Sequence, residues 1–295
     1  MRHLKLFKTY FILFIYGMLL IGCSGTPKRL TSSTLAQHHN DIGVSYLEQN
    51  RYDEAIKEFE IAIELQKNFV QAYNNLGLSY LKKGWLDRAL NTFILAIKIN
   101  PSWAELYNNR GIVYFHKNMD EKAIHDFKKA ISLNSNYPEA YYNLGMIYSK
   151  RELNEQAIEM LMKAIEINCN YLQAHNAIGL IYLKNGLYEK AEMRFKVALE
   201  IEPQYEMAYF NLGLLYEAQQ KDTEALEEYK KLLQINPNHS QAYYQIGKLC
   251  LKHKLYDEAI SKFEAVLRIE PKNSDAYQQI ELAKREKTLS IERQR

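Results

Sequence analysis

The sequence contains few residues that break helices, form disulfides or build common catalytic motifs. Its 295 residues include six prolines, twelve glycines and three cysteines. So few helix-breaking residues argue against a long disordered region. Four signatures of catalysis are missing: the HExxH zinc motif, the glycine-rich phosphate loop, the CxxC pair and the GxSxG nucleophile elbow. We therefore expect a protein that is not an enzyme and that needs no cofactor or metal.

Clustered positive charge is also scarce. The formal net charge is +3, but Arg2, Lys5 and Lys8 lie in a leader that we expect to be removed, which leaves 35 basic and 35 acidic residues. Nucleic-acid binding depends on clustered positive charge. The basic residues between Lys284 and Arg295 are mixed with acidic ones, and we interpret them as a solvated helix end. No nucleic-acid partner is expected.

The N-terminus carries an apolar run that is too short to span a bilayer. Residues 1–22 have a basic start and an apolar run from Phe11 to Ile21, about half of the ~20 residues that a spanning helix needs. This is the form of a secretory signal peptide. Its end, Leu20-Ile21-Gly22-Cys23, resembles the lipobox of bacterial lipoproteins. That resemblance implies cleavage before Cys23 and acylation of this cysteine.

An acylated Cys23 would attach the chain to a membrane, since each buried CH₂ of an acyl chain contributes ~0.8 kcal/mol. By resemblance to sorted lipoproteins, Ser24 rather than aspartate after the cysteine favours the outer membrane, facing the periplasm, in a host with two membranes. The alternative is an uncleaved signal anchor with an incidental cysteine. Residues 23–33 are mostly small and polar after the cysteine, and they predict a flexible tether.

The rest of the sequence repeats itself every 34 residues. Glycine recurs at this step as Gly43, Gly77, Gly111, Gly145, Gly179, Gly213 and Gly247. Tyrosine stands three residues after the glycine in the first six units, alanine twelve residues after it in all seven, and an aromatic residue or leucine sixteen after it. A period of about 20–50 residues is typical of solenoids, in which neighbouring units stack.

Each unit predicts two helices of roughly 12–14 residues. The glycine on the first helix and the alanine on the second let the helices pack closely, and the aromatic residue fills the space between them. Asn50, Gly84, Asn118 and Gly186 stand where the first helix must end, and these residue types accept the left-handed conformation of a C-cap. Proline, for example Pro101, then stops the second helix.

The unit from Tyr73 to Pro101, YNNLGLSYLKKGWLDRALNTFILAIKINP, resembles the tetratricopeptide repeat, and the other six units match nearly as well. The resemblance implies an all-α fold, a right-handed superhelical α-solenoid of seven 34-residue helical hairpins over residues 34–273. Residues 274–295 continue the first-helix pattern and predict a polar capping helix with a tail. In this family the signature residues build the fold, and the first helices line a concave groove that binds peptides or helices.

The variable positions of that groove are the candidate binding residues. Asn40, Asn74, Asn108, Tyr142, Asn176, Phe210 and Tyr244 stand three residues before the repeat glycine, and Asn75, Asn109, Asn143 and Asn211 stand two before it. A row of carboxamides can bind the backbone of an extended ligand, as in the asparagine ladder of some tetratricopeptide superhelices. Alternatively, asparagine is simply common at these positions of the repeat. The aromatic residues are favoured interface anchors.

Apolar residues continue the same face. Val44, Leu78, Ile112, Met146, Leu180 and Leu214 stand one residue after the glycine, and Leu47, Leu81, Phe115, Leu183 and Leu251 stand four after it. A contiguous exposed apolar patch marks a binding surface, although these residues could equally pack on the next repeat. We therefore predict a groove suited to an amphipathic helix or an apolar segment.

Charged residues at the edge of the groove do not fit the carboxylate clamp of chaperone-binding tetratricopeptide domains. That family pattern implies lysine and arginine where Asn40, Asn74 and Asn108 stand. Lysines recur instead at the groove edge, and we interpret them as solvated single charges; they are Lys82, Lys150, Lys184 and Lys252.

Histidine and cysteine give no metal or disulfide prediction. His38 and His39 are adjacent on one predicted helix and point about 100° apart, so they rarely share an ion. His175 stands where five of the other six repeats have tyrosine, which favours a packing role. Cys169 and Cys250 lie more than two repeats apart, beyond the ~7 Å that a disulfide allows between Cα atoms.

These patterns together predict a lipid-anchored protein–protein interaction scaffold of the bacterial cell envelope. Regular tetratricopeptide lipoproteins of this size resemble the pilotins of type IV pilus biogenesis, although pilotins more often have fewer repeats. That resemblance implies a role in bringing the secretin ring to the outer membrane or assembling it there. The alternative is an envelope adaptor that recruits cell-wall hydrolases or proteases.

Overall fold

A computed structural model of the chain describes residues 31–294. The predicted signal peptide, Cys23 and the tether up to residue 30 lie outside the described residues. Within the described part the chain forms fifteen helices and no strand, so the predicted all-α fold is confirmed. None of these helices combines the length and the apolar composition that crossing a membrane would need.

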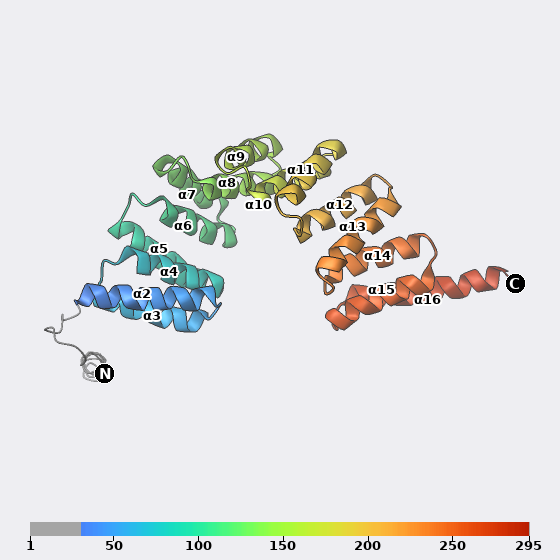
Figure 1. Ribbon diagram of the computed structural model, residues 1–295, viewed down its shortest axis with the longest axis horizontal. Coiled ribbons are helices and arrows are strands. Elements are labelled where there is room, and N and C mark those ends of the chain that lie inside the picture. Colours follow the sequence, from blue (N-terminus) through green and yellow to red (C-terminus); the bar gives the residue numbers. More distant parts are fainter. Residues whose placement is uncertain (1–30, 295) are drawn as a thin grey trace, which may run out of the picture. The chain divides into compact units, whose positions relative to one another are not determined.

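The helices pair into seven hairpins followed by one last helix (Figure 1). The first helices of the hairpins are α2 (Ser32–Glu48), α4 (Val70–Lys82), α6 (Ala104–His116), α8 (Pro138–Lys150), α10 (Leu172–Lys184), α12 (Glu206–Ala218) and α14 (Ser240–Lys252). The second helices are α3 (Tyr52–Leu65), α5 (Leu86–Ile99), α7 (Asp120–Leu133), α9 (Asn154–Ile167), α11 (Tyr188–Ile201), α13 (Asp222–Ile235) and α15 (Tyr256–Ile269). The last helix is α16 (Ser274–Gln294).

The chain divides into two compact units, unit 1 from Met1 to Pro101 and unit 2 from Ser102 to Arg295. Unit 1 contains the first two hairpins, and unit 2 contains the other five together with α16. Inside each unit, the second helix of a hairpin packs on its own first helix and on the first helix of the following hairpin, as α7 does on α6 and α8. Buried apolar clusters, each shared by neighbouring hairpins, therefore follow one another along a stack, as in unit 2.

The repeat glycines lie where the two helices of a hairpin touch. A Cβ atom built on Gly77 would lie 2.6 Å from Cε1 of Phe93, and one built on Gly111 would lie 2.6 Å from Cε1 of Phe127. Carbon atoms do not approach so closely, so any side chain there would displace the ring. Both rings are fully buried. The prediction that glycine permits close packing and an aromatic ring fills the gap is confirmed.

The first helix of every hairpin ends at a residue in the left-handed conformation. These residues, with φ between 56° and 72°, are Asn50, Gly84, Asn118, Glu152, Gly186, Gln220 and Lys254. The predicted C-caps at asparagine and glycine are confirmed. At Lys254 the turn is held by hydrogen bonds from Lys254 N to Leu251 O at 3.0 Å and from Leu255 N to Cys250 O at 2.8 Å. The turn thus forms even where the residue type disfavours it.

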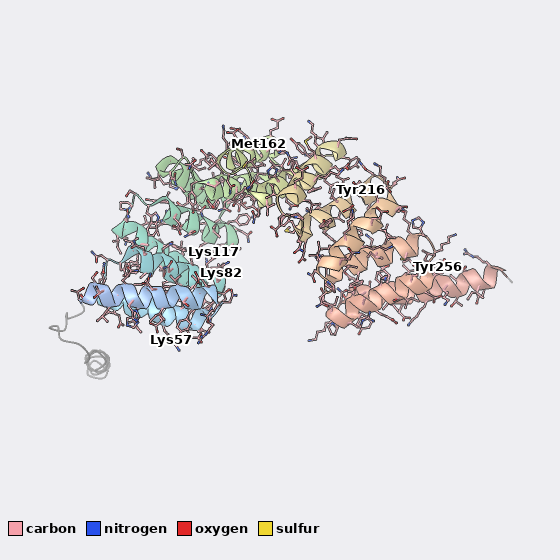
Figure 2. All side chains as sticks on the ribbon, in the orientation of Figure 1. Lys57, Lys82, Lys117, Met162, Tyr216 and Tyr256 are labelled. Atoms are coloured by element: carbon pink, nitrogen blue, oxygen red, sulfur yellow. The ribbon has the colours of Figure 1, made fainter. Side chains whose placement is uncertain are left out.

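Polar side chains add contacts between neighbouring repeats, two of them at Met162 and Tyr216, which are labelled in Figure 2. Nη2 of Arg194 on α11 donates to Sδ of Met162 on α9 at 3.4 Å. The hydroxyl of Tyr216, a repeat-signature tyrosine on α12, donates to Oε1 of Glu192 on α11 at 3.0 Å. Burial and the nearby Glu192 carboxylate raise the pKa of Tyr216. The signature tyrosine therefore ties a first helix to the second helix before it.

The two ends of the helical stretch differ slightly from the sequence prediction. The tether was predicted to reach residue 33, but α2 begins at Ser32, because Thr31 caps it by accepting a hydrogen bond from Thr34 N at 3.2 Å. At the other end, α16 packs on α15 and continues as one helix to Gln294, through the segment predicted as a polar tail. Tyr277 on α16 is 54% exposed.

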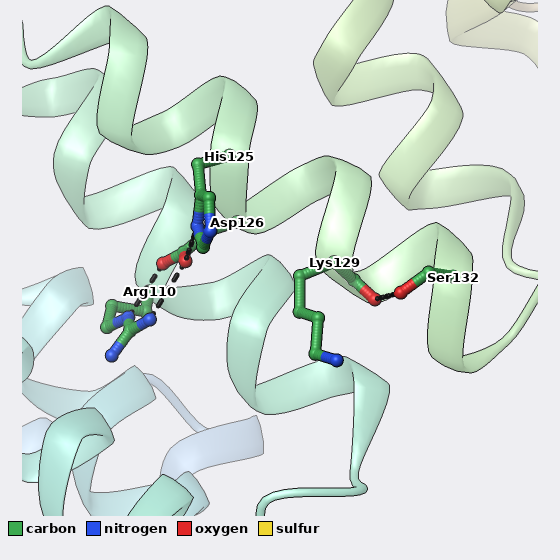
Figure 3. Close-up of polar contacts among 5 residues, drawn as sticks. All are labelled: Arg110, His125, Asp126, Lys129 and Ser132. Carbon is green, nitrogen blue, oxygen red and sulfur yellow. Dashed lines mark hydrogen bonds and ion pairs between the residues drawn. The ribbon is translucent and has the colours of Figure 1, made fainter.

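The third repeat contains a buried ion pair between its two helices (Figure 3). Arg110 Nε donates to Asp126 Oδ2 at 2.6 Å, and Arg110 Nη2 donates to Asp126 Oδ1 at 2.8 Å. Asp126 is 1% exposed. The hydrogen bonds with Asp126 raise the pKa of Arg110, so the guanidinium stays charged. The residues equivalent to Arg110 in the other six repeats are apolar. Ile42 is half-buried, and the other five are buried: Leu76, Leu144, Ile178, Leu212 and Ile246.

Candidate partner-binding face

The predicted binding residues all lie on first helices, which form one side of each unit. The first helices of successive hairpins contact one another: α2 with α4 in unit 1, and α6 with α8, α8 with α10 and α10 with α12 in unit 2. Contacts between successive second helices are fewer. We call the surface made by the first helices of a unit its first-helix face.

Three pairs of asparagine side chains join the first helices of neighbouring repeats. In each pair Nδ2 of the later residue donates to Oδ1 of the residue 35 positions earlier: Asn75 to Asn40 at 3.0 Å, Asn143 to Asn108 at 2.9 Å, and Asn211 to Asn176 at 2.7 Å. The three accepting side chains are only 3–6% exposed. Breaking such a bond would leave a buried oxygen without a partner, so these pairs stabilise the contact between repeats.

Burial divides the eleven predicted binding residues into two groups. Six are buried: Asn40, Asn74, Asn108, Asn109, Asn176 and Asn211. Five are half-buried and reach the surface: Asn75, Tyr142, Asn143, Phe210 and Tyr244. The pairing favours a structural role for the buried asparagines, and a ligand on this face would meet the second group. Contact of these residues with a partner stays a prediction.

Each of the three half-buried aromatic residues packs beside another ring. The centroid of the Tyr142 ring lies 5.4 Å from that of Tyr171, Phe210 lies 5.4 Å from His239 and 5.8 Å from Tyr229, and Tyr244 lies 5.5 Å from Phe263. A ring that is held on one side and open on the other loses little conformational freedom when a partner covers it. All three lie in unit 2.

A second row of ring side chains was not predicted. The residue at the N-cap of the first helix, eight before the repeat glycine, is Phe69, Trp103, Tyr137, Tyr171, Tyr205 or His239 in the last six repeats. Tyr171 and His239 supply the rings that pack on Tyr142 and Phe210. The sequence does show a ring at this position every 34 residues. The position was missed because it lies outside the repeat signature.

The apolar residues of the first-helix face are mostly half-buried. This holds for Val44, Leu78, Ile112, Met146, Leu214, Leu47, Leu81, Phe115, Leu183 and Leu251. Leu180, on α10, is 38% exposed. Half burial fits the packing interpretation and leaves some apolar atoms at the surface, while partner binding by these residues stays a prediction.

Three of the four lysines at the edge of this face are paired across repeats. Lys150 Nζ lies 3.0 Å from Asp120 Oδ1, Lys184 Nζ lies 2.7 Å from Glu152 Oε1, and Lys252 Nζ lies 2.6 Å from Asp222 Oδ2. The interpretation of Lys150, Lys184 and Lys252 as isolated charges is therefore wrong. The pairs are largely exposed, and exposed pairs contribute about 0–1 kcal/mol each.

Titratable side chains elsewhere form no evident reactive site. Within residues 31–294 no cluster of three or more His, Cys, Asp or Glu side chains could hold a metal. His175 is buried, with Nε2 at 3.1 Å from the Cys169 carbonyl oxygen and no hydrogen-bond partner for Nδ1. Burial lowers its pKa. This environment fits the predicted packing role of His175.

Sequence models of one family match the chain over most of its described length. A model described as TPR repeat matches residues 43–84 and 113–152. A second, described as tetratricopeptide repeat, matches residues 207–239 and 240–273, and a third with the same description matches residues 70–102, 138–170 and 172–205. No curated protein matches the chain.

Solved structures of similar architecture share little sequence with the chain. A tetratricopeptide repeat protein from Parabacteroides merdae matches with a TM-score of 0.65 and 18% identity, over 84% of this chain and 98% of its own. PilW, a widely conserved type IV pilus biogenesis factor, matches with a TM-score of 0.64 and 19% identity, over 70% and 96%. The pilF protein of Pseudomonas aeruginosa matches with a TM-score of 0.62 and 17% identity, over 73% and 97%.

Proposed function

Because the chain belongs to the tetratricopeptide repeat family, we propose that it is a non-catalytic scaffold that binds a client protein on the first-helix face of unit 2. The observation that carries this proposal is the set of half-buried rings of Tyr142, Phe210 and Tyr244, each packed beside at least one other ring and still partly exposed. Partly exposed, rigidly held aromatic side chains are typical anchors of protein interfaces.

Unit 2 is favoured over unit 1 because the two units differ at the same repeat position. Three residues before the glycine, unit 1 has Asn40 and Asn74, which are buried. Unit 2 has rings at this position in its second, fourth and fifth hairpins. Beside these rings, Met146, Leu180 and Leu214 extend the apolar surface. A client that covers this surface would be an amphipathic helix or an extended apolar segment.

Capture of the client by a photoreactive side chain tests this proposal. A photoreactive phenylalanine analogue in place of Phe210 is expected to crosslink the client in the native membrane. The matched control carries the same analogue in place of Met193, which is 57% exposed on the second helix α11 of the same unit. Capture from Met193 but not from Phe210 would sink the proposal.

The location of the scaffold follows, in this proposal, from a lipid on Cys23. The support comes from the signal-peptide pattern and from the lipobox-like residues before Cys23. Labelled palmitate is expected to be incorporated into the wild-type chain and not into Cys23→Ala, and only the wild type should sediment with the outer membrane of a diderm host. Equal palmitate labelling of the wild type and Cys23→Ala would contradict a lipid anchor on Cys23.

The client class in this proposal is the secretin of a type IV pilus, which the chain would help to reach or assemble in the outer membrane. The support is the lipoprotein-like start together with the regular repeats; the likeness to PilW and pilF, at under 20% identity, adds only a shared fold. The alternative is an adaptor for cell-wall hydrolases or proteases. Deletion that abolishes pili with an intact wall favours the secretin, and wall defects with intact pili favour the adaptor.

A further inference from the structure

Four tyrosines gather on the first-helix face of unit 2. Tyr137, Tyr171 and Tyr205 are the N-caps of α8, α10 and α12, and Tyr142 lies in α8. All four are half-buried. The rings of Tyr142 and Tyr171 are 5.4 Å apart with a 50° tilt. Burial raises the pKa of Tyr171, with smaller contributions from Glu139 and then Tyr142, and burial raises the pKa of Tyr205, with a smaller contribution from Tyr142. We call these residues the tyrosine cluster.

No lysine or arginine among the described residues lies over a ring of the tyrosine cluster, whereas eight other aromatic residues have such a contact. Elsewhere a lysine or arginine of the chain lies 4.3–5.9 Å from the ring centroids of Tyr46, Tyr80, Trp85, Tyr107, Tyr114, Phe115, Tyr182 and Tyr216. Among the described residues no such contact involves a member of the cluster. No cation of the described chain therefore competes with an outside cation for the exposed parts of these half-buried rings.

An acidic side chain lies beside the cluster. Glu139, in the first turn of α8, stands three residues before Tyr142, so the two side chains are neighbours on the helix surface. After burial, its carboxylate also contributes to raising the pKa of Tyr137 and of Tyr171. Glu202 acts in the same way on Tyr205. Glu139 is exposed and forms no ion pair with any described residue. An exposed carboxylate beside partly exposed rings is a complementary surface for a cationic side chain.

We propose that the tyrosine cluster and Glu139 bind an arginine side chain of the client. The planar guanidinium would stack against the rings of Tyr142 and Tyr171 and donate hydrogen bonds to Glu139. Arginine suits this surface better than lysine, because its flat, weakly hydrated head both stacks on rings and pairs with a carboxylate. Apolar residues flanking that arginine would meet Met146 and Leu214. This inference rests on the proposed function and adds the chemistry of the client segment.

Methyl NMR of the processed chain, labelled at its methionine methyl groups, tests the inference without a client. Met146 lies one helical turn from Tyr142 on α8, and Met207 Sδ accepts a hydrogen bond from the Tyr205 hydroxyl at 3.6 Å. N-acetyl-L-arginine amide is the probe, and N-acetyl-L-citrulline amide, its uncharged isostere, is the control. The arginine probe is expected to shift the Met146 and Met207 signals saturably at millimolar concentration. Met193, on α11, should not respond.

The variant Glu139→Gln should bind the arginine probe about fivefold more weakly or worse. Glu139 is exposed, so this variant should keep its fold, and unchanged methyl signals before titration would show that it does. Equal responses to the arginine and citrulline probes, or no shift at Met146 and Met207, would overturn the inference. If the probe fails while Phe210 still captures a client, only the arginine site is lost. If the probe binds and Phe210 captures nothing, the failure is that of the proposed function.

Discussion

Arg110 and Asp126 form a two-point ion pair inside the third hairpin, with Asp126 only 1% exposed. The fourth hairpin has Leu144 and Met160 at the same two repeat positions. Two neighbouring hairpins of unit 2 thus fill the same two positions differently, one with an ion pair and the other with two apolar side chains. A buried ion pair costs desolvation, and its geometry has to be good to repay that cost.

Removing one partner of this pair should destabilise the chain strongly. Asp126→Ala leaves the Arg110 guanidinium charged and partly buried without its acceptor, and the free energy of unfolding should fall by about 3 kcal/mol. The double variant Arg110→Leu, Asp126→Met installs the residues of the fourth hairpin and should recover most of the loss. Urea unfolding measures both. A double variant as unstable as the single one would show that packing, rather than the unpaired charge, causes the loss.

Breaking the hydrogen bond between the Asn176 and Asn211 carboxamides should lower the free energy of unfolding by less than Asp126→Ala does. Asn211→Ala removes the donor to Asn176 Oδ1, which lies on a side chain that is 4% exposed. The free energy of unfolding should fall by about 1–2 kcal/mol, the cost of an unpaired buried acceptor. Gln173→Ala, at an exposed position of α10, is the control and should change stability by less than about 0.5 kcal/mol. Similar effects of the two substitutions would contradict the assigned role.

The left-handed residue Lys254 predicts a stabilising substitution. Its φ is 61°, a conformation that glycine adopts without the steric cost that other residues bear. Lys254→Gly should therefore raise the free energy of unfolding by about 0.5–1 kcal/mol. The mirror experiment is Gly186→Ala, at φ 71°, which should lower it by about 1 kcal/mol. Thermal unfolding of both variants shows whether each substitution stabilises or destabilises the chain. A destabilised Lys254→Gly would contradict the steric cost assigned to Lys254.

His175 predicts a loss of stability at acid pH. Burial lowers its pKa in the folded chain, opposed by the hydrogen bond to the Cys169 carbonyl oxygen. Below about pH 6.5 the unfolded chain therefore binds a proton that the folded chain does not yet bind, and stability falls as the pH falls. His175→Tyr, the residue of five other repeats, lacks this proton. The stability of His175→Tyr relative to wild type should rise as the pH falls from 7.5 to 5. A difference that stays constant over this range would contradict a lowered pKa of His175.

The periodic parts of the molecule were predictable from sequence, and the exceptions were not. Glycine, alanine and aromatic spacing predicted the hairpins because those residues do the same packing in every unit. The left-handed conformation at Lys254 escaped prediction, since only tertiary context imposes it on a lysine. The ion pair joins Arg110, which stands where every other repeat has an apolar residue, to Asp126, 16 residues later, at a position that varies from repeat to repeat. The 34-residue periodicity therefore does not predict this pair.

The candidate face was predicted in part. Its aromatic members Tyr142, Phe210 and Tyr244 follow from their repeat position, and the structure adds their neighbours at the N-caps. The asparagines were placed correctly on first helices, but their burial depends on how one repeat sits on the next. Asn108 can meet Asn143 only because the position three before one glycine faces the position two before the next glycine. This one-residue shift between the paired positions cannot be predicted before the stacking of the repeats is known.

The most direct test of the central claim is the affinity of the captured client for three purified chains, measured by isothermal titration calorimetry. Phe210→Ala should weaken binding about thirtyfold, about 2 kcal/mol, as expected for an interface anchor. Met193→Ala, on α11, should bind like wild type within about twofold. Matching unfolding midpoints would show that both variants keep their fold. Wild-type affinity for Phe210→Ala together with a large loss for Met193→Ala would place the client on the second helices and contradict the claim.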